Sequence, residues 1–196
     1  MLNKKYALSI ISVVLVGSVS CYSLLGDHRF LQVTDNKVSN SEFVNLSAEE
    51  VRTKRILEIQ DELRTDKQNA ELWYMLGHAY MFDGQYDNAV IVYDYAIRLT
   101  PKITGNHYAS KASALYYSNG QKLSSEINQL LNSALAVDGN NETALMMLAA
   151  NAFVDAQYQS AIDLWVQLLD SEQADVDRVA VIDLINQAKM MMQRKS

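Results

Sequence analysis

Side chains able to do covalent or metal chemistry are few in this 196-residue chain, which has three histidines and one cysteine. His28, His78 and His107 share no metal-ligand spacing, and the lone Cys21 cannot form a disulfide or a multi-thiolate metal site within the chain. No C-x-x-C-H motif occurs, so the chain does not itself carry a c-type haem. Asp and Glu are scattered over predicted helix surfaces, where solvated charge is their ordinary role. We therefore expect no catalytic residue, no metal and no cofactor, and the chemistry left to the chain is non-covalent binding.

One stretch predicts the helices that position the binding side chains. It carries the full 34-residue tetratricopeptide repeat (TPR) pattern W-x2-L-G-x2-Y, A-x3-F, P, with Tyr in place of Phe. The matching residues are Trp73, Leu76, Gly77, Tyr80, Ala89, Tyr93, Ala96 and Pro101. Small Gly77 and Ala89 predict a close contact between a first helix at about 70–83 and a second at about 86–99, with a break at Gly84. Such helix pairs stack into curved scaffolds that bind other polypeptides on their concave face.

Two degraded copies of the repeat follow. The second contains Tyr108, Lys111, Ala112, Leu115, Ile127, Leu131, Ala134 and Gly139; the third contains Leu145, Leu148, Ala149, Tyr158, Ala161, Trp165 and Leu168. The second copy is longer by four residues, and we place one of them in the link at 101–106 and three in the turn around 118–122. Ala156 stands where Gly84 stands in the first copy.

Further helices are predicted at both ends of the array. A capping box at Ser47 and Glu50 opens a helix that runs to about Thr65. Its apolar stripe is Val51, Ile56, Ile59 and Leu63. At the other end, residues 175–193 predict a C-terminal capping helix with an apolar stripe of Val176, Val179, Ile182, Ile185, Ala188, Met191 and Met192. The expected fold is all-α: a TPR solenoid of three repeats at 47–196 with an extra helix at each end.

The N-terminal segment predicts a membrane anchor at 1–26, followed by a linker at 27–46. Lys4 and Lys5 precede twenty uncharged residues, 6–25, which are long enough for one transmembrane helix, and the basic flank predicts that the rest is translocated. Two alternatives stay open: a cleaved signal peptide, since Ser18 and Ser20 are small, or a lipoprotein signal with Cys21 acylated. All three place residues 27–196 beyond a membrane. That part has a formal charge of −8, which argues against nucleic acid as a partner.

In a stack of such pairs, the first helix of each pair lines the concave groove. The side chains offset from the packing positions there are aromatic, Met-containing and weakly polar, which suits an extended or helical peptide. They are Tyr74, His78, Met81 and Phe82 in the first pair, Asn106, Ala109, Ser113, Tyr116 and Tyr117 in the second, and Thr143, Met146, Ala150 and Phe153 in the third. This set lacks the ring of Lys and Asn expected of a clamp for a terminal carboxylate. Each member can instead be an ordinary helix-packing residue.

A resemblance to a known family rests on the run from Asn141 to Ala149, on Ala152-Phe153, Ala161-Ile162 and Leu164-Trp165, and on the closing run from Ile185 to Lys189. These residues are similar to the TPR subunits of bacterial c-type cytochrome maturation systems. More narrowly, they resemble the TPR subunit of the haem lyase that serves formate-dependent nitrite reductase. The resemblance implies an inner-membrane anchor, a periplasmic TPR domain and other haem lyase subunits as partners. It also implies that the groove holds the C-terminal tail of an apocytochrome c and presents it for haem attachment. A general cytochrome c maturation subunit, or a scaffold of another membrane complex, is the alternative.

Overall fold

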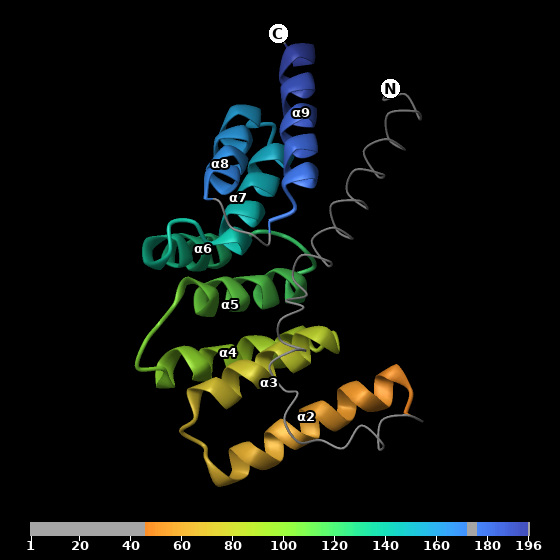
Figure 1. Cartoon of the computed structure of the whole chain (residues 1–196), viewed down its shortest axis with the longest axis vertical. Helices are drawn as coiled ribbons and strands as arrows, with labels where there is room; N and C mark the ends of the chain where they lie inside the picture. Colours follow the sequence, from red (N-terminus) through yellow and green to blue (C-terminus); the bar gives the residue numbers. More distant parts are fainter. Residues whose placement is uncertain (1–45, 172–175, 196) are drawn as a thin grey trace. The chain divides into compact units, whose positions relative to one another are not determined.

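The structure is a computed structural model that describes residues 46–171 and 176–195. Within these ranges every regular element is a helix, and the helices follow one another in chain order from α2 at one end to α9 at the other (Figure 1). They are α2 (Ala48–Thr65), α3 (Ala70–Phe82), α4 (Tyr86–Leu99), α5 (Gly105–Ser118), α6 (Ser125–Val137), α7 (Glu142–Val154), α8 (Tyr158–Asp170) and α9 (Arg178–Lys195).

The predicted anchor at 1–26, with Cys21, and the predicted linker at 27–46, apart from Leu46, lie outside the described residues. No helix in the described ranges is long and apolar enough to cross a membrane.

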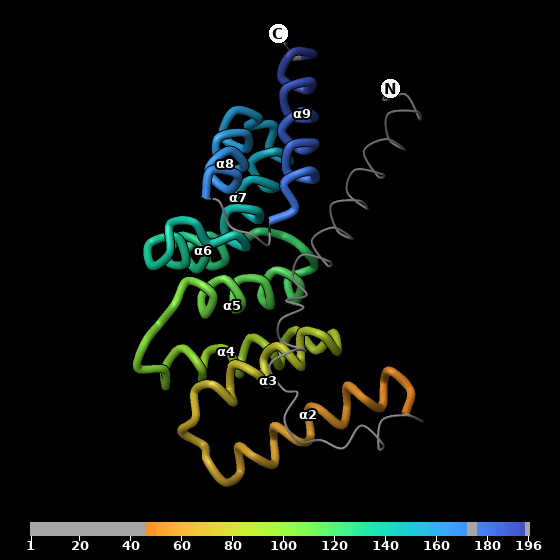
Figure 2. Tube along the Cα trace, viewed as in Figure 1, coloured from red at the N-terminus to blue at the C-terminus, as the bar shows by residue number. Residues whose placement is uncertain are grey.

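Three antiparallel hairpins form the body of the fold: α3 with α4, α5 with α6, and α7 with α8 (Figure 2). Each hairpin also packs on the next, through α4 on α5 and α6 on α7, while α2 packs on α3 and α9 packs on α8. The predicted all-α TPR-like solenoid is thus confirmed for the described part of the chain. Its first repeat begins and ends within one residue of the predicted bounds.

The predicted insertions also lie where they were expected. Residues 83–85 join the first hairpin and 155–157 the third, whereas 119–124 join the second, which is three residues longer. The link 100–104 exceeds the link 138–141 by one residue. Gly84 has a φ of 75°, and Ala156 takes the same left-handed conformation with a φ of 57°, as its place in the repeat predicts.

The first repeat depends on a close contact at Gly77. A Cβ atom built on Gly77 would lie 2.3 Å from Cε1 of Tyr93, well inside van der Waals contact. The Tyr93 ring is 1% exposed and burial raises the pKa of its hydroxyl well above the usual value. Glycine is therefore required here because the tyrosine ring of α4 occupies the space that any side chain on α3 would need.

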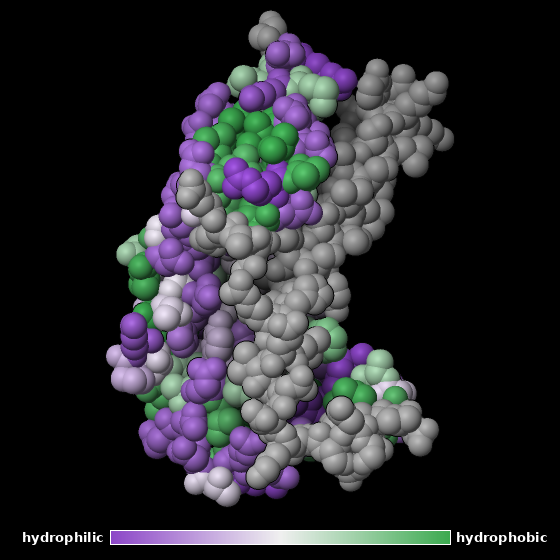
Figure 3. All heavy atoms as spheres, in the orientation of Figure 1, coloured by the Kyte–Doolittle hydropathy of each residue, from purple (hydrophilic) through white to green (hydrophobic). Residues whose placement is uncertain are grey.

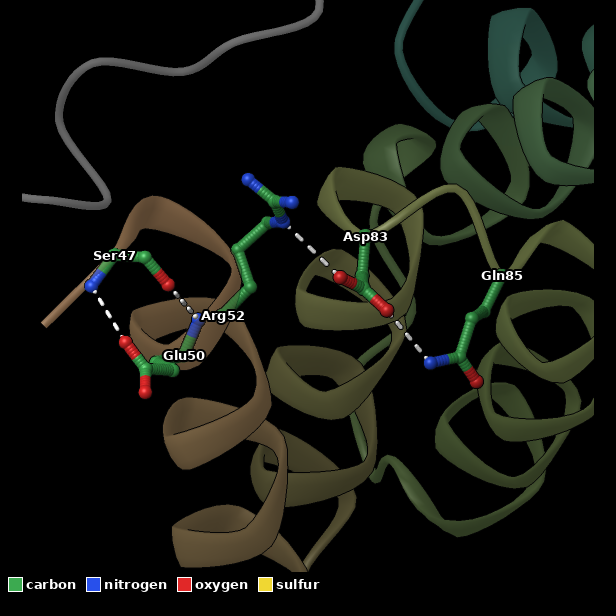
Figure 4. Close-up of polar contacts among 5 residues, drawn as sticks. All are labelled: Ser47, Glu50, Arg52, Asp83 and Gln85. Carbon is green, nitrogen blue, oxygen red and sulfur yellow. Dashed lines mark hydrogen bonds and ion pairs between the residues drawn. The ribbon is translucent and has the colours of Figure 1, made fainter.

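Local polar contacts fix the start of α2 and its place on the first hairpin (Figure 4). The backbone N–H of Ser47 donates to the Glu50 carboxylate at 2.7 Å, the Glu50 N–H donates to the Ser47 hydroxyl at 3.2 Å, and these bonds lower the pKa of Glu50. Arg52 Nε donates to Asp83 Oδ1 at 3.0 Å, and Gln85 donates to the other carboxylate oxygen at 2.7 Å. The Gln85 bond, and then Arg52, lower the pKa of Asp83. These contacts join α2 to the α3–α4 turn.

The buried faces agree with prediction for α2 and differ for α9. Ile56, Ile59 and Leu63 of α2 are buried, as expected. Val176, just before α9, and Val181, Ile185 and Ala188 on α9 are buried. Val179, Ile182, Met191 and Met192, predicted on the same stripe, are exposed. The prediction stepped along α9 by threes, and each such step turns 60° short of a full turn, so its stripe winds off the face that packs on α8.

Candidate peptide-binding groove

The predicted groove residues lie on α3, α5 and α7, the first helices of the three hairpins. α5 contacts α7 directly. α3 reaches α5 through a hydrogen bond of 3.0 Å between the hydroxyls of Tyr74 and Ser110. These contacts place α3 next to α5 and α5 next to α7, although the three helices are separated in sequence.

An aromatic cluster occupies the α3 end of this surface. The ring of Tyr74 meets His78 edge-on at 4.6 Å and lies 4.8 Å from the ring of His107 on α5. His78 in turn meets the buried Tyr93 at 5.6 Å. Tyr74 and His78 are half-buried, so part of each side chain stays exposed to solvent. The sequence predicts Tyr74 and His78 as groove residues but not His107, whose ring lies beside Tyr74.

The position of His107 at the start of α5 lowers its pKa, which favours the neutral imidazole. The Thr104 backbone N–H donates to His107 Nδ1 at 3.2 Å, and the Thr104 hydroxyl lies 2.8 Å from the same atom. Burial lowers the pKa of His107, and the nearby Glu71 carboxylate opposes part of that effect. The signal for this residue was its position three residues after Thr104, where a capping box places a side-chain acceptor.

A second aromatic cluster lies at the C-terminal end of α5. Tyr117 stacks on Tyr86 of α4 at 5.1 Å, and Tyr116 meets Tyr117 edge-on at 5.6 Å. The Ser118 hydroxyl donates to the Asp87 carboxylate, again on α4. Tyr117 is therefore braced from the preceding hairpin. The bracing residue Tyr86 was missed because its partner is distant in sequence.

Ser113 is not a groove residue, contrary to the prediction. Its side chain is 1% exposed, its hydroxyl donates to the Ala109 carbonyl at 3.0 Å, and it lies 3.5 Å from the sulfur of Met147 on α7. Ala109 is buried as well. Both residues are small, so α7 packs closely against this face of α5 and closes it.

The other predicted residues keep open surface. Phe82 is 66% exposed, and Asn106 and Ala150 are exposed. Met81, Tyr116, Tyr117, Met146 and Phe153 are half-buried. Asn106 Oδ1 accepts a bond of 2.6 Å from the Asn141 amide, which joins α5 to the link before α7. Half-buried aromatic and thioether groups of this kind offer apolar contacts to a peptide and supply no nucleophile or general base. Whether each of them contacts a ligand stays a prediction.

Comparisons with known proteins agree on one family. The TPR domain of cytochrome c-type biogenesis protein H matches residues 29–179. The formate-dependent nitrite reductase complex subunit NrfG of Escherichia coli O157:H7 is 35% identical over 136 residues, covering 69% of this chain and 68% of that protein. The bifunctional subunit NrfFG of Haemophilus influenzae is 40% identical over 161 residues, covering 79% of this chain but only 41% of its relative.

A solved structure supports the fold independently. The anaphase-promoting complex hetero-tetramer Cut9-Hcn1 has a chain that aligns with a TM-score of 0.58 at 20% identity, covering 78% of this chain and 32% of that one. This likeness concerns architecture alone. The domain match spans most of the chain, and the two relatives above are named as nitrite reductase complex subunits. The chain therefore belongs to the family of the cytochrome c-type biogenesis protein H TPR domain, in the form found as the TPR subunit of formate-dependent nitrite reductase complexes.

Proposed function

We propose that this protein is a membrane-anchored periplasmic adaptor that holds the C-terminal segment of an apocytochrome c, of nitrite reductase type, for haem attachment. The observation that carries the proposal is the run of half-buried aromatic and Met side chains on α3, on the C-terminal end of α5 and on α7. Tyr74, Tyr117 and Met146 represent the three helices. In a member of this family, that run is the surface suited to a peptide client.

The role of the adaptor is to bind and orient, and the covalent step belongs to its partners. The groove positions on these three helices carry hydroxyl, thioether, imidazole and ring groups, which contact a polypeptide without cleaving or modifying it. A bound tail loses its conformational freedom, and its attachment motif is then presented to a lyase at high local concentration. We assign haem ligation and bond formation to the other haem lyase subunits.

A neighbouring membrane subunit is part of the proposal. In Haemophilus influenzae the relative is named as a bifunctional subunit that joins F and G parts in one chain. Joining two parts in one polypeptide keeps them side by side, which supports an F-type subunit as a partner of the present chain. The uncharged segment 6–25 after Lys4 and Lys5 supports an anchor that places this contact at the inner membrane.

The test is calorimetric binding of a synthetic peptide to the full-length protein in detergent. The peptide carries the C-terminal sequence of the apo nitrite reductase from the same organism, and a scrambled peptide of equal composition is the control. We expect a micromolar Kd, about −8 kcal/mol, because the peptide loses chain entropy on binding. Tyr117→Ala and Met146→Ala should each weaken binding by about 1–2 kcal/mol, while Val166→Ala on α8 should not. Equal heats from the two peptides would remove the cytochrome client and leave a TPR scaffold for another complex.

A further inference from the structure

The last helix, α9, has the register of a first helix of a repeat. α7 begins at Glu142 and buries its fourth, eighth and eleventh residues, Leu145, Ala149 and Ala152. α9 begins at Arg178 and buries the residues at the same three positions, Val181, Ile185 and Ala188. It packs on α8 as α7 packs on α6. α9 is therefore the first half of a fourth repeat, whose second helix is absent from the described residues.

This register predicts which side chains of α9 extend the groove. In the repeat register, the predicted groove positions are the second, fifth, ninth, twelfth and thirteenth residues of each first helix, although the fifth and ninth on α5, Ala109 and Ser113, are buried. On α9 these positions are Val179, Ile182, Asn186, Lys189 and Met190, and all five are exposed. Val179 is 72% exposed and Met190 is 51% exposed, which is unusual for apolar residues in a packed helix. Figure 3 shows apolar side chains gathered over the α7–α9 end of the molecule, with polar side chains around them.

The charged residues differ between the two ends of the extended groove. Among the residues at these positions on the four helices α3, α5, α7 and α9, Glu71 on α3 is the one Asp or Glu and Lys189 on α9 is the one Lys or Arg. Asn186 lies one turn before Lys189 on the same face of α9. An amide and an ammonium one turn apart can donate to the two oxygens of a carboxylate. α9 thus supplies a Lys and an Asn one turn apart. The groove positions of α3, α5 and α7 contain no such pair of donors.

We propose that α9 is the fourth binding helix of the groove and takes the C-terminal end of the client, with its terminal carboxylate at Lys189 and Asn186. This rests on the proposed function. Axes of directly packed helices lie about 8–10 Å apart, so a segment that crosses α3, α5, α7 and α9 needs at least about 10 residues if extended or about 20 if helical. The upstream part of the client then leaves the groove at α3, next to Glu71. A second copy is the weaker occupant for α9, because pairing two apolar stripes would bury Lys189 without a partner.

The experiment compares two client peptides, one ending in a free carboxylate and one in an amide, on full-length protein in detergent. Wild type should bind the acid about three- to fivefold more tightly than the amide, as expected of an exposed ion pair. Lys189→Met should remove this preference while keeping the apolar stem. Arg194→Met, the matched neutralisation on another face of α9, should keep it. Ile182→Asp should weaken both peptides about tenfold, while Val166→Asp on α8 should weaken neither.

The outcomes separate the two proposals. If Tyr117→Ala weakens binding but Ile182→Asp does not, or if the acid is still preferred after Lys189→Met, the client binds α3–α7 and α9 is no part of the groove. If neither peptide binds wild type, the proposed function falls together with this inference. If Ile182→Asp dissociates a dimer seen by sedimentation and leaves both affinities unchanged, a second copy occupies α9. Circular dichroism spectra and melts of the variants check that each one is folded, in particular Tyr117→Ala, since Tyr117 is half-buried while the other sites are exposed.

Discussion

Replacing Gly77 by Ala tests the close contact on which the first repeat is built. The new Cβ would lie 2.3, 2.5 and 2.7 Å from three ring atoms of Tyr93, so the ring or the helix must move by about 1 Å. The ring has little room to move, since it is 1% exposed and lies against Tyr74 and His78, with centroids at 5.6 Å in both pairs. Overpacking of this kind costs about 1–3 kcal/mol, and we take the upper value because the ring is confined. Ala gains about 1 kcal/mol over Gly in helix propensity, which leaves a net loss of about 2 kcal/mol.

The assay is thermal unfolding of the full-length protein followed by circular dichroism. A loss of about 2 kcal/mol lowers the Tm of a domain of this size by about 4–8 °C. Tyr93→Leu removes the clashing ring, so in that background Gly77→Ala should cost nothing or should stabilise by up to about 1 kcal/mol. Gly120→Ala is the control, since nothing lies within 4 Å of its Cβ and only its left-handed φ of 63° is strained. If Gly77→Ala lowered the Tm equally in both backgrounds, the contact with Tyr93 would not be the reason for the glycine.

Three further predictions concern the turns, the pH response and the topology. Gly84→Ala should destabilise by about 1 kcal/mol, whereas Ala156→Gly should stabilise by about 0.5–1 kcal/mol, because both positions are left-handed; paired thermal melts check this. His107 has a pKa below its ordinary 6.5, so the neutral form favours folding: its contribution is complete above about pH 6.5 and is lost as the pH falls below that value. The Tm should therefore fall on acidification, and His107→Gln should flatten that part of the profile; an unchanged slope contradicts the assignment. An alkaline phosphatase fusion after residue 40 should be active in the periplasm, and an inactive fusion refutes the proposed orientation.

Features coded by neighbouring residues could be predicted from the sequence. The capping box at Ser47 and Glu50, the break at Gly84 and the longer turn after α5 each depend on a few consecutive residues. Their geometry is local, so residue type and spacing are sufficient to place them. The repeat pattern then relates one hairpin to the next, which is why Ala156 could be placed in a turn without a glycine.

Features that depend on how closely two helices approach could not be predicted in the same way. Ser113 stands at a groove position in the repeat, but α7 packs so closely on α5 there that its side chain is sealed beneath Met147. Its neighbours Ala109 and Ala112 were the available signal, because small residues allow close packing. The apolar stripe predicted for α9 was wrong in part for a different reason. Residues spaced only by three wind around a helix, whereas the buried residues Val181, Ile185 and Ala188 are spaced by four and then three, which keeps them on one face.

The turn that closes each first helix also positions the end of the groove. In the first hairpin the Gly84 N–H donates to the Met81 carbonyl at 3.2 Å, and the Gln85 N–H donates to the Tyr80 carbonyl at 2.9 Å. The second hairpin repeats this pair of bonds, since Gly120 donates to the Tyr117 carbonyl and Gln121 donates to the Tyr116 carbonyl. In the third hairpin Ala156 donates to the Phe153 carbonyl and Gln157 donates to the Ala152 carbonyl. Each pair ends its helix in a left-handed residue and fixes the last turn, where the groove aromatics lie.

The extra residues of the second hairpin fit this arrangement, because the chain after Gln121 is longer while the closure before it is unchanged. An insertion beyond the closing bonds lengthens only the outer turn, so it leaves Tyr116 and Tyr117 in place on the binding surface. An insertion before the closing bonds would rotate both rings around α5 by about 100° per residue and remove Tyr117 from its stack on Tyr86. An insertion at this position therefore keeps the proposed groove side chains in register across the hairpins.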